Sequence, residues 1–280
     1  MANVNICSGG SSVLPQTMTK YLQDKVGKDV VVLNATVTAI GLETDSPDSG
    51  MIVTAAGKDH KYSHVISTIP LPVLRTVDLS RSKLDILQEN ALRQLQYGPS
   101  IKVGVLFNET WWTNGQDKDG KPFNIVGGQS YTDLPVRTVV YPSYGAYTSD
   151  VSKTLIASYC WTDDAERMGS LIGTGEAKYE EQLEHLILSN LAAVHNVEYS
   201  YLKSRIVDIH SWDWNHNPLT MGKFDCVCHE SSKTHIHHCL LGAFAFFGPG
   251  NFEDMYTSLN RPAANDKLHF VGEALSIRHA

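Results

Sequence analysis

The stretch LHFVGEALSIRHA, residues 268–280, decides how the rest of the chain is interpreted. Its apolar start predicts a strand over residues 268–271, which runs into Gly272 and Glu273 and then into a helix. A glycine at the end of a strand lets a ligand approach the backbone, and an acid beside it can accept hydrogen bonds from ribose or ribityl hydroxyls. Taken alone, this acid is better explained as a carboxylate favoured by the dipole of the following helix. The surrounding segments are therefore needed to choose between a ligand-binding acid and an acid that only stabilises the helix.

The elements expected on either side of this stretch are mostly strands. Apolar spacing predicts helices over residues 14–26, 82–96 and 176–194. Short runs rich in β-branched and aromatic residues predict strands over residues 30–33, 36–40, 51–55, 60–69, 101–107, 136–141, 154–161, 205–212, 240–247 and 268–271. Because strands outnumber helices and do not alternate simply with them, the expected fold class is mixed α/β, or α+β.

Composition excludes several classes of partner. The formal net charge is −7 over 280 residues, which argues against a nucleic-acid surface. No run approaches the roughly 18 apolar residues of a membrane span, so no membrane partner is expected. The first residues, MANVNICSGGSS, lack the basic and apolar regions of a secretory signal. Five cysteines do not suggest a disulfide framework, and a cytoplasmic location is the default expectation.

Seven segments together resemble the flavin-dependent amine oxidases, in particular the fungal-like L-amino-acid oxidase branch. GEALSIRHA is similar to the first half of the C-terminal flavin signature of that family. In chain order the other segments are GGSSVLPQTMTKYL, VVLNATVTAI, HVISTIPLPVL, QYGPSIKVGVLFNETWW, GAFAFFGPGNF and LNRPAANDKLHFVGEA. The resemblance implies part of a two-domain fold, with an FAD-binding domain interleaved with a mixed-sheet substrate domain. It predicts FAD-binding residues at 1–75 and 242–280 and a substrate domain at 76–220.

The resemblance implies a catalytic lysine and two contacts to FAD. Lys102 matches the lysine that holds a water near the flavin, although a strand lysine can also extend its amine to solvent from an edge. The backbone of Val37 matches a contact to the adenine end of FAD, and Val37 reads equally well as a core valine. Trp214 matches a tryptophan beside the flavin. Trp212, two residues earlier, would face the same side of a strand, so the assignment can slip by that pair.

The same resemblance assigns two further contacts to FAD and two contacts to the substrate. Gly272 and Glu273 match the ribityl or ribose contact of FAD. Tyr159 aligns with a tyrosine that binds the substrate carboxylate, and an ordinary strand aromatic is an equally good reading. Ala280 falls where the family has a small residue whose carbonyl receives the substrate amine.

These roles imply oxidative deamination. An L-amino acid would be oxidised to an imino acid and hydrolysed to a 2-oxo acid and ammonia, while dioxygen is reduced to hydrogen peroxide. The expected partners are therefore the amino acid or amine and dioxygen, with a homodimer suggested by the family. A monoamine or polyamine oxidase is one alternative. A catalytically inactive fragment, either a binding module or a remnant of a gene model, is another.

One departure from the family pattern concerns the ends of the chain. No Gly-x-Gly-x-x-Gly pattern occurs anywhere in the sequence. In the family this phosphate-binding loop and a carboxylate-binding arginine lie in the N-terminal part, and an aromatic residue follows the position of Ala280. We therefore expect a fragment of a longer protein, which would not bind FAD tightly on its own.

The second departure is the stretch DCVCHESSKTHIHHC, residues 225–239, within an expected insertion at 221–241. Deleting residues 223–242 joins the flanks into LTMGAFAFFGPG, as in the family. Gly-Lys-Phe at 222–224 can be encoded with the intron start GTAAGT, and Leu-Gly at 241–242 with a terminal AG. We interpret the insertion as a translated intron and expect no metal. The alternative is a zinc site built from Cys226, Cys228, His229, His235, His237, His238 and Cys239.

Overall fold

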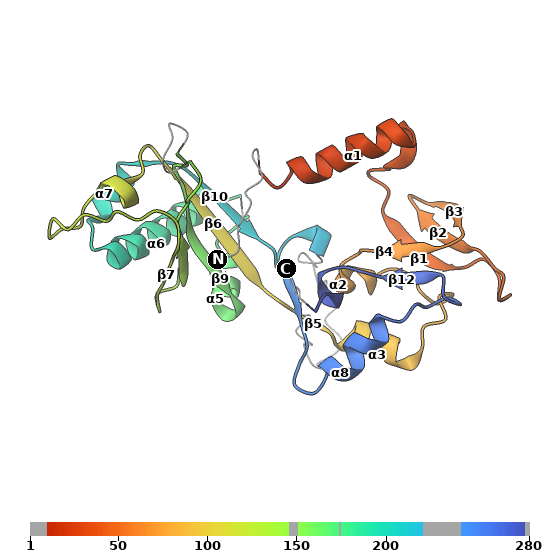
Figure 1. Cartoon of the computed structure of the whole chain (residues 1–280). Helices are drawn as coiled ribbons and strands as arrows, with labels where there is room; N and C mark the ends of the chain where they lie inside the picture. The colour runs from red at the N-terminus through yellow and green to blue at the C-terminus, as the bar shows by residue number, and fades with distance from the viewer. Residues whose placement is uncertain (1–9, 146–150, 174, 221–241, 278–280) are drawn as a thin grey trace. The chain divides into compact units, whose positions relative to one another are not determined.

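The computed structural model describes residues 10–145, 151–173, 175–220 and 242–277 (Figure 1). The backbone packs as two compact units. The smaller unit comprises Met1–Val65 and Val77–Lys83, and the larger comprises Ile66–Thr76 and Leu84–Ala280. These units follow backbone packing, and the domain bounds given by the family resemblance stay a prediction.

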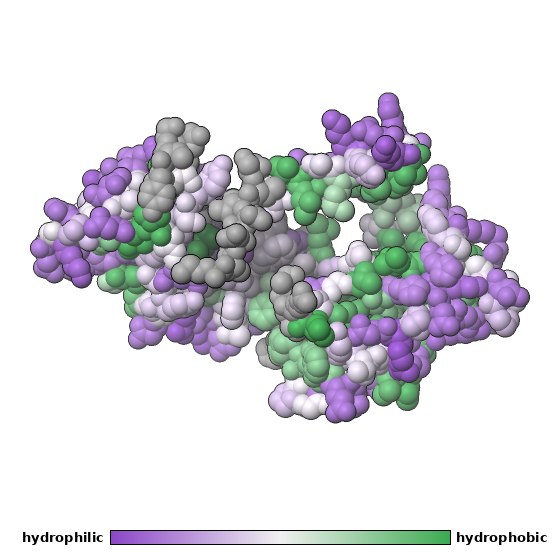
Figure 2. Space-filling model, in the orientation of Figure 1, coloured by the Kyte–Doolittle hydropathy of each residue, from purple (hydrophilic) through white to green (hydrophobic). Residues whose placement is uncertain are grey.

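The smaller unit contains a three-stranded antiparallel sheet in the order β1-β2-β3. Its strands are β1 (Val37–Leu42), β2 (Met51–Ala55) and β3 (Lys58–Tyr62). The β2–β3 hairpin turns at Ala56 and Gly57, which both have positive φ angles, as a tight two-residue hairpin requires. All five β3 residues are exposed, and Figure 2 shows the surface over β2 and β3 as mostly hydrophilic.

Helix α1 (Val13–Lys25) precedes this sheet and confirms the helix predicted over residues 14–26. None of its residues is buried. The strand predicted over residues 30–33 is wrong. Residues Lys28–Val30 form a 3-10 turn, η1, and the exposed Val32 and Leu33 pair with no strand among the described residues. Their β propensity has no effect here, since a strand is stabilised by its neighbours.

The larger unit contains a five-stranded antiparallel sheet in the order β10-β6-β9-β8-β7 (Figure 1). The two long central strands are β6 (Ser100–Phe107) and β9 (Thr154–Trp161). Strands β7 (Gln129–Tyr131), β8 (Thr138–Val140) and β10 (Ile206–Asp213) complete it. The strand predicted over residues 154–161 is thus confirmed with its ends, and those predicted over residues 101–107, 136–141 and 205–212 are confirmed with small shifts of theirs.

One face of this sheet carries the main hydrophobic core. Ile101, Val103 and Val105 alternate along β6 and are fully buried, because successive side chains of a strand point to opposite faces. Helix α6 (Ala177–His195) contributes Leu183, Ile187, Leu188 and Leu191 to the same core. Each such side chain contributes roughly 1.5–3 kcal/mol when fully buried. The opposite face of β6 is left for Lys102, Gly104 and Leu106.

Shorter elements flank the sheet and were not all foreseen. Helices α4 (Trp111–Asn114), α5 (Thr162–Gly169) and α7 (Tyr199–Lys203) belong to this part of the unit. Phe107 on β6 packs edge-to-face against Trp111 and Trp112. Helix α5 was missed because only eight residues with one apolar stripe give a weak periodic signal.

The rest of the larger unit is built from short paired segments. Strand β5 (Gln96–Gly98) pairs with β11 (Phe244–Phe246), and β4 (Val65–Ser67) pairs with β12 (Leu268–Phe270). Helices α2 (Leu71–Leu74), α3 (Ile86–Gln94) and α8 (Phe252–Leu259) and the 3-10 turns η2 (Pro218–Thr220) and η3 (Glu273–Leu275) complete it. The strand predicted over residues 60–69 is two strands, β3 and β4, separated by residues 63 and 64.

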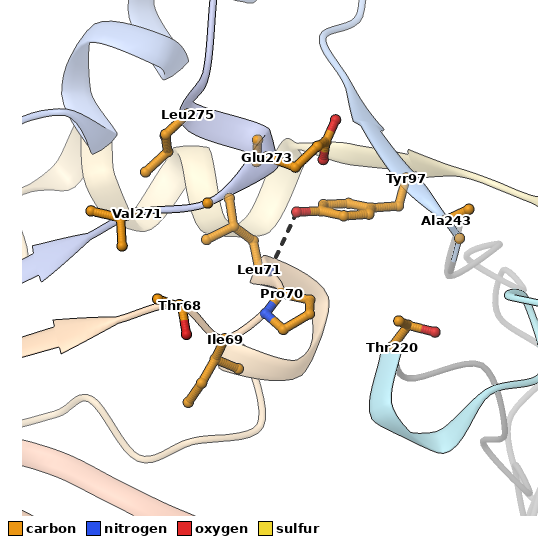
Figure 3. A pocket seen from close by; sticks show the side chains of 13 residues that line it. Thr68, Ile69, Pro70, Leu71, Tyr97, Thr220, Ala243, Val271, Glu273 and Leu275 are labelled. Atoms are coloured by element: carbon orange, nitrogen blue, oxygen red, sulfur yellow. Dashed lines mark hydrogen bonds between the residues drawn. The ribbon is translucent and has the colours of Figure 1, made fainter. Parts of the chain in front are cut away.

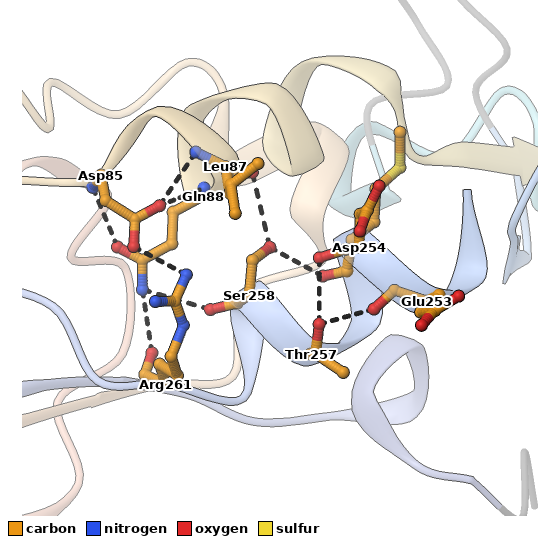
Figure 4. Close-up of polar contacts among 9 residues, drawn as sticks. Asp85, Leu87, Gln88, Glu253, Asp254, Thr257, Ser258 and Arg261 are labelled. Atoms are coloured by element: carbon orange, nitrogen blue, oxygen red, sulfur yellow. Dashed lines mark hydrogen bonds and ion pairs between the residues drawn. The ribbon is translucent and has the colours of Figure 1, made fainter. Parts of the chain in front are cut away.

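A polar network centred on the buried Gln88 joins α3 to α8 (Figure 4). Asp85 caps α3 by accepting hydrogen bonds from the backbone of Leu87 and Gln88 at 2.9 Å. The Gln88 side chain donates to the carbonyls of Ser258 at 3.3 Å and Arg261 at 2.9 Å. Arg261 pairs in turn with Asp85 at 2.8 Å. The network fixes the segment that leads into β12 and Glu273.

The described residues contain no helix that is long and apolar enough to cross a membrane.

Candidate functional site

Lys102 lies in a row of three side chains that crosses the five-stranded sheet. The strand registers place Lys102 on β6 opposite Tyr159 on β9 and Trp212 on β10. The neighbours Ile101 and Val103 point into the core on the other face. Because β6 has strands on both sides, Lys102 does not lie on an edge strand, and its exposed amine stands on the open face of the sheet.

The Lys102 amine sits over an aromatic ring. Its Nζ atom lies 4.8 Å from the centroid of the Tyr159 ring, within range of a cation–π interaction. Tyr159 packs edge-to-face on Trp161 with ring centroids 5.6 Å apart, and Trp161 packs on Phe244 at 5.7 Å. A continuous aromatic surface therefore runs from the lysine to strand β11.

This aromatic surface walls a hollow of about 570 Å³, here called the aromatic hollow. Its size and its apolar walls with a few polar groups are typical of small-molecule sites. Glu273 lies at its margin, where its carboxylate oxygens accept hydrogen bonds from the Ala245 backbone N–H at 3.0 and 3.3 Å. The predicted substrate residue and the predicted cofactor acid thus share one cavity. The lining residues are Tyr159, Trp161, Phe244, Ala245, Phe246, Phe247, Phe252 and Glu273.

A smaller hollow of about 200 Å³ lies on the other side of Glu273 (Figure 3), here called the backbone hollow. It is formed where the loop after β4 meets the loop after β12. The lining residues are Thr68–Leu71, Tyr97, Thr220, Gly242, Ala243 and Val271–Leu275. Two strand ends and a helix start expose backbone groups here, which suits a polar ligand lying along the chain.

Tyr97 anchors the floor of the backbone hollow. Its buried hydroxyl accepts a hydrogen bond from the Leu71 backbone N–H at 3.4 Å. Burial raises the pKa of Tyr97 to about 12, with the Glu273 charge adding to the effect. The phenol therefore stays neutral near pH 7 and serves as a hydrogen-bonding group.

Gly272 holds a backbone conformation that favours glycine. Its φ of 141° lies in a region that other residues rarely adopt. A Cβ atom built at this position would meet no atom within 4 Å, so the glycine is needed for its conformation and its outer side is open to a ligand. It also forms the N-cap of η3, which begins at Glu273.

The two tryptophans on and after β10 occupy different places. Trp212 is the register partner of Lys102. Trp214 lies just past the end of β10, where its backbone N–H donates to the Ser100 carbonyl at 3.1 Å. Their rings pack edge-to-face at 5.6 Å. Trp214 as the flavin-side tryptophan stays a prediction.

The structure does not test three further predictions. Val37 begins β1 in the smaller unit, where it pairs with Ala55. Ala280 lies outside the described residues, as do residues 221–241 with the whole Cys/His stretch. Within the described ranges, no group of three His, Cys, Asp or Glu side chains is placed to hold a metal ion.

Several lining residues were not named by the sequence reasoning, although their segments were. Tyr97, Phe244 and Phe252 lie in stretches that carried the resemblance, and Trp161 lies two residues after Tyr159. The sequence signal that could have indicated an aromatic binding surface is the recurrence of phenylalanine every few positions in GAFAFFGPGNF. Nothing in the sequence, however, indicated that this stretch pairs with β5 and faces Tyr159.

Comparison with known proteins places this geometry in context. The sequence profile described as "Flavin containing amine oxidoreductase" matches residues 2–280. L-amino-acid oxidase 4 of Hebeloma cylindrosporum is 68% identical over 273 residues, covering 97% of this chain and 40% of that protein. A putative bifunctional amine oxidase of Dictyostelium discoideum is 35% identical, covering 97% of this chain and 23% of that protein.

Solved structures share the fold. A putrescine oxidase variant aligns with a TM-score of 0.66 and 18% identity, over 97% of this chain and 48% of that one. Cyclohexylamine oxidase from Brevibacterium oxydans aligns with a TM-score of 0.60 and 15% identity, over 91% and 46%. The chain thus spans less than half the length of each of these proteins.

Proposed function

The chain belongs to the flavin-containing amine oxidoreductase family, and from this premise we propose that it carries the substrate-oxidising site of an FAD-dependent L-amino-acid oxidase. The observation that supports this most directly is that Tyr159, whose ring lies under the Lys102 amine, lines the same hollow as Glu273. The 68% identity to a fungal L-amino-acid oxidase favours amino acids over simple amines as substrates.

The residues around the backbone hollow fit part of the cofactor. The open side of Gly272, the Glu273 carboxylate and the backbone of Thr68–Leu71 would hold the ribityl portion of FAD. Val37 is proposed for the adenine end. A hollow of about 200 Å³ is too small for all of FAD, and the sequence has no Gly-x-Gly-x-x-Gly loop for its pyrophosphate. When bound, FAD supplies the hydride acceptor for the substrate α-carbon and passes electrons to dioxygen.

Tyr159 would orient the substrate. Its hydroxyl is the polar end of an otherwise aromatic wall and can donate a hydrogen bond to the substrate carboxylate. Hydrogen bonds to charged groups contribute roughly 1.5–3 kcal/mol, and the nearby Lys102 ammonium adds attraction for the same carboxylate. A simple amine would leave this hydroxyl without its partner.

Lys102 would supply charge and a water. Its ammonium has three donors, and one of them can hold a water molecule over the open face of the sheet. Because the aromatic hollow has low polarity, a fixed positive charge beside it stabilises negative charge that develops during the reaction more strongly than solvent would.

The aromatic wall would admit the substrate side chain and keep out water. Trp161, Phe244 and Phe252 present ring faces and edges to the hollow and few hydrogen-bonding groups. Excluding water strengthens the contacts of Lys102 and Tyr159 with the substrate. The wall also favours substrates with apolar side chains.

Product stoichiometry tests the proposal. With flavin bound, L-phenylalanine should yield one phenylpyruvate, one ammonia and one hydrogen peroxide per dioxygen consumed, and 2-phenylethylamine should react far more slowly. Faster oxidation of the amine would indicate an amine oxidase instead. Protein that holds flavin but forms no peroxide with either compound would indicate an inactive binding module. The homodimer stays part of the proposal, and light scattering of the purified chain tests it.

A further inference from the structure

A third hollow, of about 630 Å³, lies beside the edge strand β10, here called the edge hollow. It opens between the end of α5 and the turn that follows β10. It shares no lining residue with the aromatic hollow or the backbone hollow. The lining residues are Gly169, Ser170, Ile172, Gly173, Ser211, Trp212, Asp213, His216, Asn217 and Leu219.

A buried carboxylate orients a histidine in the edge hollow. Asp213 is 9% exposed, and its Oδ1 atom accepts a hydrogen bond from the Asn215 backbone N–H at 2.7 Å. Its Oδ2 atom pairs with Nδ1 of His216. Gly169 packs so closely that a Cβ there would come within 2.4 Å of Oδ2, which would force the carboxylate to move. The carboxylate is therefore held in place on three sides.

This arrangement fixes which nitrogen a ligand would meet. Because Nδ1 of His216 donates to Asp213, the ring orientation is set and Nε2 is the atom that remains for other partners. The His216 side chain is 51% exposed, whereas that of Asp213 is 3% exposed, so the histidine and not the acid faces the hollow. In its protonated form the ring balances the Asp213 charge and donates from Nε2.

The remaining wall combines one more donor with apolar surface. The Oδ1 atom of Asn217 accepts a hydrogen bond from the Leu219 backbone N–H at 2.9 Å, so the Nδ2 group is what this side chain offers a ligand. Trp212 is 44% exposed and Leu219 is 78% exposed. When the His216 ring is protonated, two N–H donors thus stand beside an aromatic ring and an aliphatic side chain.

We propose that the edge hollow binds a small monocarboxylate with an apolar side chain. Its carboxylate would accept hydrogen bonds from His216 Nε2 and Asn217 Nδ2, and its side chain would pack on Trp212 and Leu219. The volume lies within the range of small-molecule sites. When the His216 ring is protonated, the two N–H donors that line the hollow match the two oxygens of a carboxylate, and the one on His216 carries charge.

This second site does not depend on flavin or on the proposed reaction. An amino acid and its 2-oxo acid both carry the required carboxylate, so either could occupy it. Trp212 is the register partner of Lys102, which puts an occupied edge hollow one strand away from the lysine.

Calorimetric titration of the full chain without added flavin tests the site. The probe is 3-phenylpropionate, which has the ring and the carboxylate but no α-amine to oxidise. The alcohol 3-phenyl-1-propanol is the control that lacks the carboxylate. We expect the acid to bind and the alcohol to bind with an affinity at least roughly tenfold lower. A hydrogen bond to a charged group contributes about that much affinity.

Matched variants locate the bound probe. His216→Gln and Asn217→Ala should each weaken 3-phenylpropionate at least roughly tenfold. His210→Gln changes another exposed histidine of β10 next to Trp212 and should leave affinity within twofold.

Three results would overturn the proposal: no binding at millimolar probe, equal binding of the alcohol, or unchanged affinity in both His216→Gln and Asn217→Ala. L-phenylalanine and phenylpyruvate are then titrated against the same variants. If the affinity of either compound falls in Asn217→Ala, that result supports the site. The compound that binds more tightly is then identified as the natural occupant of the edge hollow.

Discussion

Lys102 and Tyr159 lie opposite each other on strands β6 and β9, with the Lys102 amine 4.8 Å from the centre of the Tyr159 ring. Both side chains stand on the sheet face away from the core, in the middle of the sheet instead of at an edge. A lysine that only made the surface soluble would not need a position on a central strand with its amine over an aromatic ring. The pair therefore forms the centre of the proposed oxidising site.

Lys102→Met should abolish most turnover without unfolding the protein. Removing the ammonium removes the held water and the positive charge, and loss of one such electrostatic contact typically costs about 10²–10³ in kcat. The thermal midpoint should stay within a degree or two, because the side chain is exposed. Steady-state peroxide release in the flavin-bound protein measures the loss of turnover.

Lys58→Met provides the matched control, since Lys58 is an exposed strand lysine on β3. It should leave kcat unchanged. Unchanged peroxide release in Lys102→Met itself would remove the lysine from the reaction.

Gln88→Ala should destabilise the larger unit. The Gln88 side chain is 2% exposed, donates to the carbonyls of Ser258 and Arg261, and accepts from the Asp85 backbone N–H, so its removal breaks three hydrogen bonds and the capping box of α3. The expected cost is about 1–3 kcal/mol in the free energy of unfolding. Urea denaturation checks it, with the exposed Gln94→Ala on the same helix as control. Equal stability of the two variants would contradict a structural role for the network.

Stability should fall in acid because of His195. This buried histidine donates from Nδ1 to the Leu191 carbonyl at 2.8 Å, and its Nε2 lies 2.5 Å from the Tyr141 hydroxyl. Burial lowers the pKa of His195 below its usual value near 6.5. Between the two pKa values the unfolded chain binds the extra proton, so folding stability rises with pH there and is lost as pH falls below about 6.5.

The slope from one such group can reach about 1.4 kcal/mol per pH unit. Urea denaturation at pH 7.5 and at pH 5.5 measures it. His195→Gln should reduce the difference between the two values, whereas the exposed His185→Gln should not. An equal pH dependence in all three proteins would show that other groups titrate in this range.

The sequence predicted the strands that carry the site better than the contacts that close it. Strand 154–161 was placed without error, and the register then brought Tyr159 to Lys102. The bond from Ala245 to Glu273 was not predictable, because it depends on how β11 folds back against a turn 28 residues later. Residues 30–33 were assigned a strand from β-branched composition alone, and no neighbouring strand was present to support one.

The central claim is that Tyr159 receives the carboxylate of an amino acid at this site. The most direct measurement compares kcat/KM of the wild-type protein and Tyr159→Phe for L-phenylalanine and for 2-phenylethylamine. The account predicts a loss of about 10- to 100-fold for the amino acid and little change for the amine, since only the amino acid has a carboxylate for the hydroxyl. An equal loss for both substrates, or none for the amino acid, would contradict it.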